Sequence, residues 1–371
     1  MEIKSFSLSD NLTDFIMLPF KLYKGTPYEK FWVPPLISEQ KKLFSKKNPF
    51  FNHAKIIFFV AYEKGQPVGR IAAIVDQNHI NFHNEKCAFF GYFDSINDQA
   101  VADCLFDEAK KIAKAEGMEI IRGPYNPSTN DEIGLLLEGF DSSPVIMMTY
   151  NPPYYINLVE KTGLKKAKDL LAFFNTTKDD ASDRIKKIVE RVKKKENLTV
   201  RNFDIKNFDK EVKIFKEIYN SAWEKNWGFV PMTDEEIDYM AESLKPLLDQ
   251  RIAHFLEVDG KVVGSSLCVP DYNFVIKKLN GRMGPIEIIK FLYFKNKIPI
   301  VRLMTLGVIK EYRNRGLEAV LYYEALIAAR NAGFIGGEMS WTLEDNNLIN
   351  KGIEAMGGKV YKKYRVYETA I

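Results

Sequence analysis

Apolar residues occur along this chain in short strand-like runs and in longer helical stripes, and the same order of runs is found twice. Residues 58–76 and residues 255–271 each contain two apolar runs around a turn, which is the pattern of a β-hairpin. Both turns have the spacing Gly-x-x-Val-Gly, beginning at Gly65 and at Gly260. Glycine suits such a turn because it adopts positive φ angles without a steric penalty. The pattern therefore predicts one hairpin in each half.

The runs that follow the two hairpins also correspond. They predict a strand, a helix and a second strand, at residues 87–94, 100–116 and 118–123 in the first half and at residues 300–308, 317–332 and 334–341 in the second. A short helix that ends in glycine comes next, at Gly163 and at Gly357, and a lysine-rich, aromatic strand pattern follows it. The matching order indicates an internal duplication.

Alternating strands and helices in both halves predict an α/β fold, with a mixed β-sheet flanked by helices in each copy. A chain of 371 residues also exceeds what one hydrophobic core usually supports, so we expect two domains. We place these domains at residues 1–178 and 179–371, with one copy of the duplication in each.

The segment at residues 181–201 combines an apolar stripe with a basic face. Its apolar residues stand at helical spacing, namely Ile185, Ile188, Val189 and Val192. We interpret it as a surface helix that opens the second domain, and a surface that binds RNA or lipid is the alternative. Thr233 and Glu236 have the spacing of a capping box, which predicts a further helix start.

Composition limits the class of protein. Hydrophobic residues make up 46% of the chain and charged residues 27%, which is ordinary for a soluble globular protein. No segment approaches the roughly 18 apolar residues of a membrane span, and the first residues lack the pattern of a secretory signal. Cys87, Cys104 and Cys268 have no metal-type spacing and leave an odd thiol. We therefore expect a cytoplasmic protein without a metal ion. The net charge of +4 indicates no particular partner.

The segment at residues 303–326 carries the clearest chemical signal. An apolar strand leads into a basic turn that contains glycine, and the turn opens a strongly helical run. A helix N-terminus presents unpaired N–H groups and a partial positive charge, so it suits a phosphate group. Arg313 and Arg315 add positive charge to this turn, and Gly316 lets a ligand come close to the backbone.

This turn resembles the phosphate-binding signature of the GNAT superfamily of N-acyltransferases, Gln/Arg-x-x-Gly-x-Gly/Ala after a Val-x-x-x-Tyr-Arg lead-in. Arg313 and Gly316 match its first and fourth positions, whereas Glu318 departs from the sixth. Nearly the whole chain resembles bacterial proteins with two tandem GNAT-like domains, because it also has their Gly-Pro-x-Asn-x-Ser and Tyr-Tyr stretches. The N-terminal copy lacks the signature and is acidic at the corresponding place, so we regard that copy as degenerate.

The resemblance implies acetyl-CoA or another acyl-CoA as cosubstrate. The residues expected to bind it are Leu306, Gly307, Val308, Arg313, Asn314, Arg315, Gly316, Leu317 and Asn346. Many family members carry a tyrosine as general acid where this chain has Ile353. Glu338 is our candidate for the general base, and a glutamate on a solvent-facing strand position is the alternative. Tyr322 and Tyr323 are expected to pack or to cap rather than to react, and His254 is expected to be a core histidine.

The resulting hypothesis is an acyl-CoA-dependent N-acyltransferase that acts on an amine of a small molecule or a peptide. A non-catalytic protein that binds acyl-CoA or another ligand is one alternative, which Ile353 favours. A Fem-type aminoacyl transferase that uses charged tRNA is another, which the basic helix and Glu318 favour. Nucleic acid is expected only in that last case. The sequence does not assign the acceptor, the acyl length or the oligomeric state.

Residues 273–297 form an insertion between the second hairpin and the strand that follows it. Pro285 stands at a first helical position, and the residues after it are apolar around most of a helix. We expect this helix to bury its apolar face against the N-terminal copy. The alternatives are that it lines the acceptor pocket, or that it rests on a membrane surface beside its flanking lysines.

Overall fold

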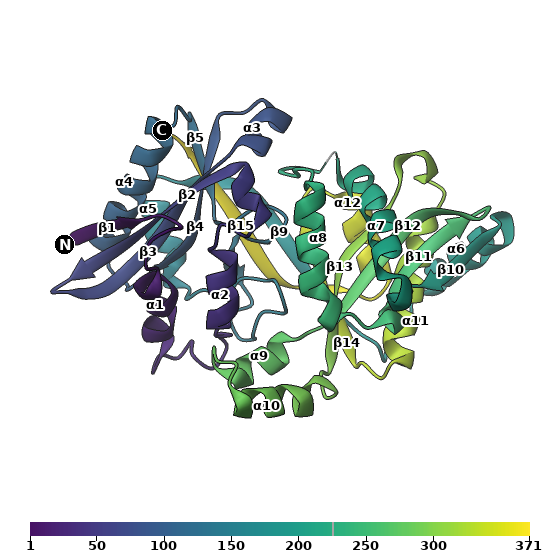
Figure 1. Ribbon diagram of the computed structural model, residues 1–371. Helices are drawn as coiled ribbons and strands as arrows, with labels where there is room; N and C mark the ends of the chain where they lie inside the picture. The colour runs from purple at the N-terminus through teal and green to yellow at the C-terminus, as the bar shows by residue number, and fades with distance from the viewer. Residues whose placement is uncertain (225) are drawn as a thin grey trace. The chain divides into compact units, whose positions relative to one another are not determined.

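The computed structural model describes residues 1–224 and 226–371 and divides them into two compact units (Figure 1). Unit 1 comprises Met1–Leu170, Asn273–Tyr293 and Lys362–Ile371, and unit 2 comprises Leu171–Tyr272 and Phe294–Tyr361. Each unit has a mixed sheet with helices packed on it, so the predicted fold class is confirmed.

Unit 1 holds most of the first copy and the insertion. Its elements are β1 (Glu2–Phe6), α1 (Thr13–Tyr23), α2 (Ile37–Leu43), η1 (Pro49–Asn52), β2 (Ala54–Glu63), β3 (Gln66–Asp76), α3 (Gln77–His83), β4 (Cys87–Ser95), α4 (Gln99–Ala115), β5 (Ile120–Gly123), β6 (Tyr125–Asn126), β7 (Glu132–Ile133), β8 (Leu135–Glu138), α5 (Tyr154–Lys161), α9 (Asn273–Leu279) and nearly all of α10 (Pro285–Lys295). Its strand order is β1-β2-β3-β4-β5-β15, and β8 also pairs with β15 (Lys359–Ala370).

Unit 2 holds most of the second copy. Its elements are α6 (Asp183–Lys195), β10 (Leu198–Asn202), η2 (Ile205–Asn207), α7 (Phe208–Trp223), α8 (Asp234–Leu244), η3 (Lys245–Leu247), η4 (Gln250–Ile252), β11 (Ala253–Val258), β12 (Lys261–Pro270), β13 (Ile300–Val308), η5 (Lys310–Tyr312), α11 (Leu317–Asn331), β14 (Gly336–Leu343) and α12 (Asn347–Ala355). Its strand order is β9-β14-β13-β12-β11-β10, where β9 is Lys165–Thr176.

The predicted repeat is present in the order of the elements. The first copy runs β2, β3, β4, α4, β5, α5, β9, and the second runs β11, β12, β13, α11, β14, α12, β15. Both hairpins close through two residues with positive φ, Lys64–Gly65 at 50° and 77° and Asp259–Gly260 at 52° and 75°. Positive φ at both turn positions is the type I′ geometry, whose twist matches that of the strands.

The last strand of each copy passes from one unit to the other. Residues 171–176 of β9 belong to unit 2, and residues 362–370 of β15 belong to unit 1, where Tyr367 pairs with Gly123 of β5. Backbone pairing requires only an open strand edge, so the hydrophobic pattern of a strand does not specify which sheet receives it. The division of the chain into domains at residues 1–178 and 179–371 stays a prediction.

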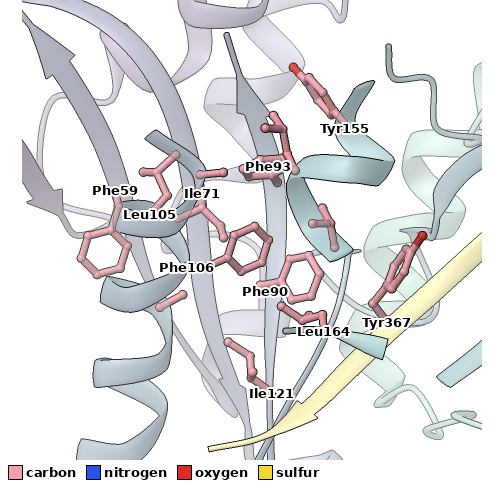
Figure 2. Packing of buried hydrophobic residues seen from close by; sticks show 14 of the residues in the cluster. Phe59, Ile71, Phe90, Phe93, Leu105, Phe106, Ile121, Tyr155, Leu164 and Tyr367 are labelled. Atoms are coloured by element: carbon pink, nitrogen blue, oxygen red, sulfur yellow. The ribbon is translucent and has the colours of Figure 1, made fainter. Parts of the chain in front are cut away.

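Helices cover the sheets through the apolar stripes that the sequence shows. In unit 1, α4 packs Leu105 and Phe106 against Phe59, Ile71 and Phe90 of the sheet (Figure 2). In unit 2, α6 buries Ile185, Val189 and Val192, and its charged residues, most of them lysines and arginines, lie on the rest of its surface, as expected of a surface helix. The Thr233–Glu236 capping box is also confirmed.

The expected burial of the α10 apolar face is wrong. Five of its large apolar side chains are exposed, and none of its residues is buried. The preceding helix, α9, anchors the insertion instead: Val275 and Leu279 are buried there, and the Asn273 side-chain amide donates to the Pro144 carbonyl at 3.0 Å. Among the described residues, no helix combines the length and apolar character that crossing a bilayer requires.

This difference between α9 and α10 predicts unequal effects of truncation on stability. Ile289 is 69% exposed and Leu279 is 2% exposed. Ile289→Ala should change the free energy of unfolding by less than about 0.5 kcal/mol, whereas Leu279→Ala should lower it by about 2–5 kcal/mol. Urea unfolding followed by circular dichroism measures both values. An equal loss in the two variants would show that the α10 face is buried in solution.

Candidate active site

In unit 2, two parallel strands pair over a short stretch and then separate. Strands β13 and β14 are in register from Ile300 opposite Gly336 to Leu303 opposite Met339. Beyond Leu303, β13 stays paired with β12 as far as Val308, but its pairing with β14 ends. The main chain of residues 304–306 therefore has an edge that β14 does not cover.

A β-bulge in β13 marks the point of separation. Leu267 of β12 lies opposite Thr305, and Cys268 lies opposite Leu303, so Met304 has no partner on β12. An extra residue in one strand bends that strand and increases its local twist, which directs it away from a flat neighbour.

A cleft of about 70 Å³ occupies this separation. Residues from both separated strands line it, together with Trp223 at the end of α7, Tyr322 of α11 and Asn346 at the start of α12. Two residues that the sequence assigned to the acyl-CoA site, Leu306 and Asn346, thus lie at one cleft. Ile353, at the position where the family often has tyrosine, also lines it and is fully buried.

The polar groups of the cleft differ in their hydrogen bonds and in their surroundings. Asn346 caps α12, because its side-chain oxygen accepts the Ile349 amide at 3.4 Å. The Thr305 hydroxyl is buried and has no hydrogen-bond partner within the described residues. Burial and the Glu318 carboxylate raise the pKa of Tyr322, so its phenol stays protonated at neutral pH. Tyr322 packs on the core as expected, and it also lines the cleft, which its spacing on the helix did not indicate.

The turn before α11 leaves the start of this helix without a side-chain cap. Gly316 occupies the N-cap position with φ of 81°, and Asn314 has φ of 63°. A Cβ atom at Gly316 would lie 3.0 Å from Val192 of α6, so both its backbone angle and its neighbour favour glycine. Uncapped helix amides are the groups that bind an anion.

Both arginines of the turn make bonds within the chain. Arg313 donates to the carbonyls of Val308 at 3.3 Å, Ser221 at 3.1 Å and Ala222 at 2.8 Å, and so joins the end of α7 to the end of β13. Arg315 forms an ion pair with Glu196. Their contact with acyl-CoA stays a prediction, and the structure assigns both guanidinium groups an additional role in holding the turn.

The remaining predicted residues are packed beside the cleft. A Cβ atom at Gly307 would lie 2.7 Å from the Ala222 side chain, and Val308 and Leu317 are buried. These residues do not line the cleft and instead fix the strand end and the helix start that flank it.

Glu338 is not on a solvent-facing position. Its side chain is fully buried, and its carboxylate accepts hydrogen bonds from the hydroxyls of Ser340 and Tyr361. Ser340 lines the cleft, and Arg302 donates to the Ser340 hydroxyl at 3.1 Å. Glu338 therefore reaches the cleft through Ser340. His254 lies elsewhere in unit 2, where burial lowers its pKa.

Two parallel strands also separate in unit 1, and different residues line the space between them. Strands β4 and β5 pair from Cys87 opposite Ile120 to Phe89 opposite Arg122, and the register of β4 with β3 shifts after Arg70. A cavity of about 310 Å³ opens there, lined by residues of β4, of the 124–151 loops and of the α1–α2 segment. The sequence assigned no site to these residues.

A histidine, a carboxylate and a cysteine also lie close together in unit 1. The possible ligand atoms of His79, Glu85 and Cys87 are within 4.8 Å of one another. Arg122 binds both carboxylate oxygens of Glu85, at 2.9 and 2.8 Å, and burial raises the pKa of the Cys87 thiol to about 12. The thiol is therefore not ionised at neutral pH, and Glu85 already has a cationic partner.

Two curated proteins resemble the chain over nearly its full length. It is 35% identical over 378 aligned positions to Protein YghO of Escherichia coli (strain K12), with 100% of this chain and 95% of that protein covered. It is 36% identical over 371 positions to the Bacterial ceramide synthase of Caulobacter vibrioides (strain NA1000 / CB15N), with 97% and 95% covered. A comparison with models of known protein families found no match.

Solved structures with the same fold are much less similar in sequence. A tandem GNAT protein from the clavulanic acid biosynthesis pathway superposes with a TM-score of 0.57 at 11% identity, covering 100% of this chain and 98% of that one. A GCN5-related N-acetyltransferase from Sphaerobacter thermophilus has a TM-score of 0.55 at 10% identity, covering 99% and 95%. The chain therefore has a tandem GNAT fold, and it belongs to the family that contains Protein YghO and the Bacterial ceramide synthase.

Proposed function

We propose that this protein is an acyl-CoA-dependent N-acyltransferase whose acceptor is the primary amine of a long-chain amphiphile. The separation of β13 from β14 is the observation that carries the proposal, because it provides an uncovered main-chain edge beside an uncapped helix start. The name of the relative at 36% identity favours the acceptor class. A ceramide is a long-chain amino alcohol acylated on nitrogen, so that name describes amide formation on such an amine.

The residues of the cleft fit the chemistry of acyl-CoA. Its extended arm carries amide groups, which the main chain of residues 304–306 and the unpartnered Thr305 hydroxyl would pair with. Its pyrophosphate suits the uncapped amides of α11. Glu318 also stands in the first turn of that helix, where burial and its carboxylate together raise the pKa of Tyr322.

The reaction exchanges one acyl bond for another. The amine nitrogen bonds to the thioester carbonyl carbon, the carbon–sulfur bond breaks, and the amine proton is removed while the sulfur leaves as a thiol. We assign donation of a proton to the leaving sulfur to Tyr322. Ile353 has no proton to give, and Tyr322 lines the same cleft. Glu338 takes up the amine proton through the Ser340 hydroxyl in this proposal, which keeps it as the base without direct contact with the cleft.

Product analysis tests the proposed reaction. Purified protein with palmitoyl-CoA and sphinganine should yield the N-acyl amide and free CoA thiol in equal amounts, measured by mass spectrometry and a thiol reagent. The N,N-dimethyl form of the same amine is the matched control and should give no amide, because its nitrogen has no proton to lose. Thioester binding without turnover would support the non-catalytic alternative. Acyl transfer only from charged tRNA would support the Fem-type alternative.

Phenylalanine variants of two neighbouring tyrosines in α11 distinguish a role in proton donation from a role in packing. Tyr322→Phe should lower kcat by about 10²-fold or more, the usual effect of losing a general acid, with little change in the KM for acyl-CoA. Tyr323→Phe removes the same hydroxyl from a side chain that packs on the core and does not line the cleft, so its kcat should be unchanged. Steady-state kinetics of both variants is the measurement, and equal kcat values would remove Tyr322 from the mechanism.

A further inference from the structure

We propose that α10 docks on the surface of an anionic lipid bilayer, with its exposed apolar side chains among the acyl chains and its lysines beside the lipid phosphates. This inference goes beyond the proposed function and does not depend on it, because docking on vesicles can be measured without an acyl donor or an acceptor. The two are compatible, since a long-chain amphiphile itself partitions into a bilayer.

Exposed apolar side chains are concentrated in the insertion at residues 273–297. Twelve large hydrophobic side chains are exposed among the described residues, and half of them belong to this insertion. These six are Met283, Ile286, Ile288, Ile289, Leu292 and Tyr293. A gathering of this kind marks a surface that contacts a protein or a membrane, whereas single exposed apolar residues carry no such meaning.

The exposed apolar side chains of α10 form one continuous sector of the helix. At about 100° per residue, this sector spans about 160° and runs in the order Ile288, Leu292, Ile289, Tyr293, Ile286. The opposite sector holds Glu287, Phe291 and Phe294, which are half-buried and attach the helix to the rest of the chain. A helix that lies in the plane of a membrane interface has this division between an apolar sector and an opposite polar or covered one.

The charge of the insertion is complementary to an anionic surface. Residues 273–297 contain six lysines and arginines and a single acid, Glu287. The other residues of the chain contain 47 basic and 48 acidic side chains, so the excess positive charge of the protein lies in this insertion. Lys290 and Lys295 are exposed and stand at the two edges of the apolar sector. Lysines at such edges reach the level of the lipid phosphates when the sector is inserted.

The first part of the insertion fixes α10 to unit 1. Helix α9 buries Val275 and Leu279, and the Lys277 ammonium donates to the Ser143 hydroxyl at 2.9 Å. The carbonyl of Gly281, between the two helices, accepts the Ile37 amide at 2.9 Å. The helix is thus formed and anchored before it meets a partner, and docking avoids the entropic cost of ordering a disordered segment.

Two other arrangements fit these observations less well. Helix α6 is also basic, but it buries its apolar stripe, and none of its large hydrophobic residues is exposed, so it offers charge without an apolar sector. A second copy of this chain would bring one positively charged insertion against another, which like-charge repulsion opposes.

Flotation of the full chain with lipid vesicles tests the proposal. Vesicles of phosphatidylcholine alone are compared with vesicles of equal parts phosphatidylcholine and phosphatidylglycerol. The protein should bind the anionic vesicles at least about tenfold more tightly, and concentrated salt should remove this preference. Absence of binding to the anionic vesicles, or equal binding to both kinds, would overturn the proposal.

Two matched pairs of variants locate the docking surface. Leu292→Ser should weaken binding to anionic vesicles about tenfold, because it removes an apolar side chain from the inserted sector. Leu348→Ser makes the same change at an exposed position of α12 and should leave binding unchanged. Lys290→Gln should weaken binding about fivefold, whereas Lys194→Gln in α6 should have little effect. Equal effects within either pair would contradict docking through α10.

Melting and sedimentation complete the test. Leu292→Ser should melt at the wild-type temperature, because its side chain is exposed. If it melts earlier, Ile289→Ser at a more exposed position of the same sector takes its place in the flotation assay. Sedimentation equilibrium without vesicles measures self-association. A wild-type dimer that Leu292→Ser dissociates, together with no binding to vesicles, would assign the sector to a second copy and overturn the proposal.

Discussion

A bulge that ends the pairing of two parallel strands is the constraint on which both candidate sites depend. In unit 2 it leaves Met304 without a partner and exposes one edge of residues 304–306. In unit 1 the corresponding shift follows Arg70, and β4 and β5 pair no further than Phe89 and Arg122. A sheet without this defect would pair its strands along their full length, and neither cleft nor cavity would have a place to form.

The two copies have different residues at the point where their parallel strands separate. In unit 2 the following helix begins at a glycine, so its amides stay available, and the cleft carries hydroxyls from Thr305 and Tyr322. In unit 1 the following helix is capped by the Asp98 side chain. The cavity there is larger than the unit 2 cleft, and aromatic residues form part of its lining. One copy thus offers uncapped helix amides beside a cleft, and the other offers a larger cavity. Duplication followed by such divergence explains why the copy without the phosphate turn still keeps a cavity.

Local patterns predicted the elements well, because periodicity and turn chemistry are properties of neighbouring residues. The glycine turns of both hairpins, the apolar stripe of α6 and the Thr233 capping box all appear in the structure. The resemblance to the GNAT signature placed Leu306 and Asn346 at one cleft. The bonds of Arg313 to the carbonyls of Ser221 and Ala222 were not predictable, because these partners lie in α7, about ninety residues earlier.

Features that depend on distant parts of the chain were missed. The unit 1 cavity combines residues from Pro19 to Ile276, and no window of the sequence contains them together. The exchange of β9 and β15 depends on which sheet edge is open, which a strand pattern does not record. The exposure of α10 was missed because an apolar helix pattern shows only that a face can be buried. The pattern does not show whether another element of the fold packs on that face.

Hydrogen–deuterium exchange with and without a non-hydrolysable acyl-CoA analogue tests the central claim that the unit 2 strand separation receives the acyl donor. The account predicts that the analogue slows exchange at the amides of residues 304–306 and of the first turn of α11. The exposed helix α10 should be unaffected. Slowed exchange confined to other segments, or no change at saturating analogue, would contradict the account.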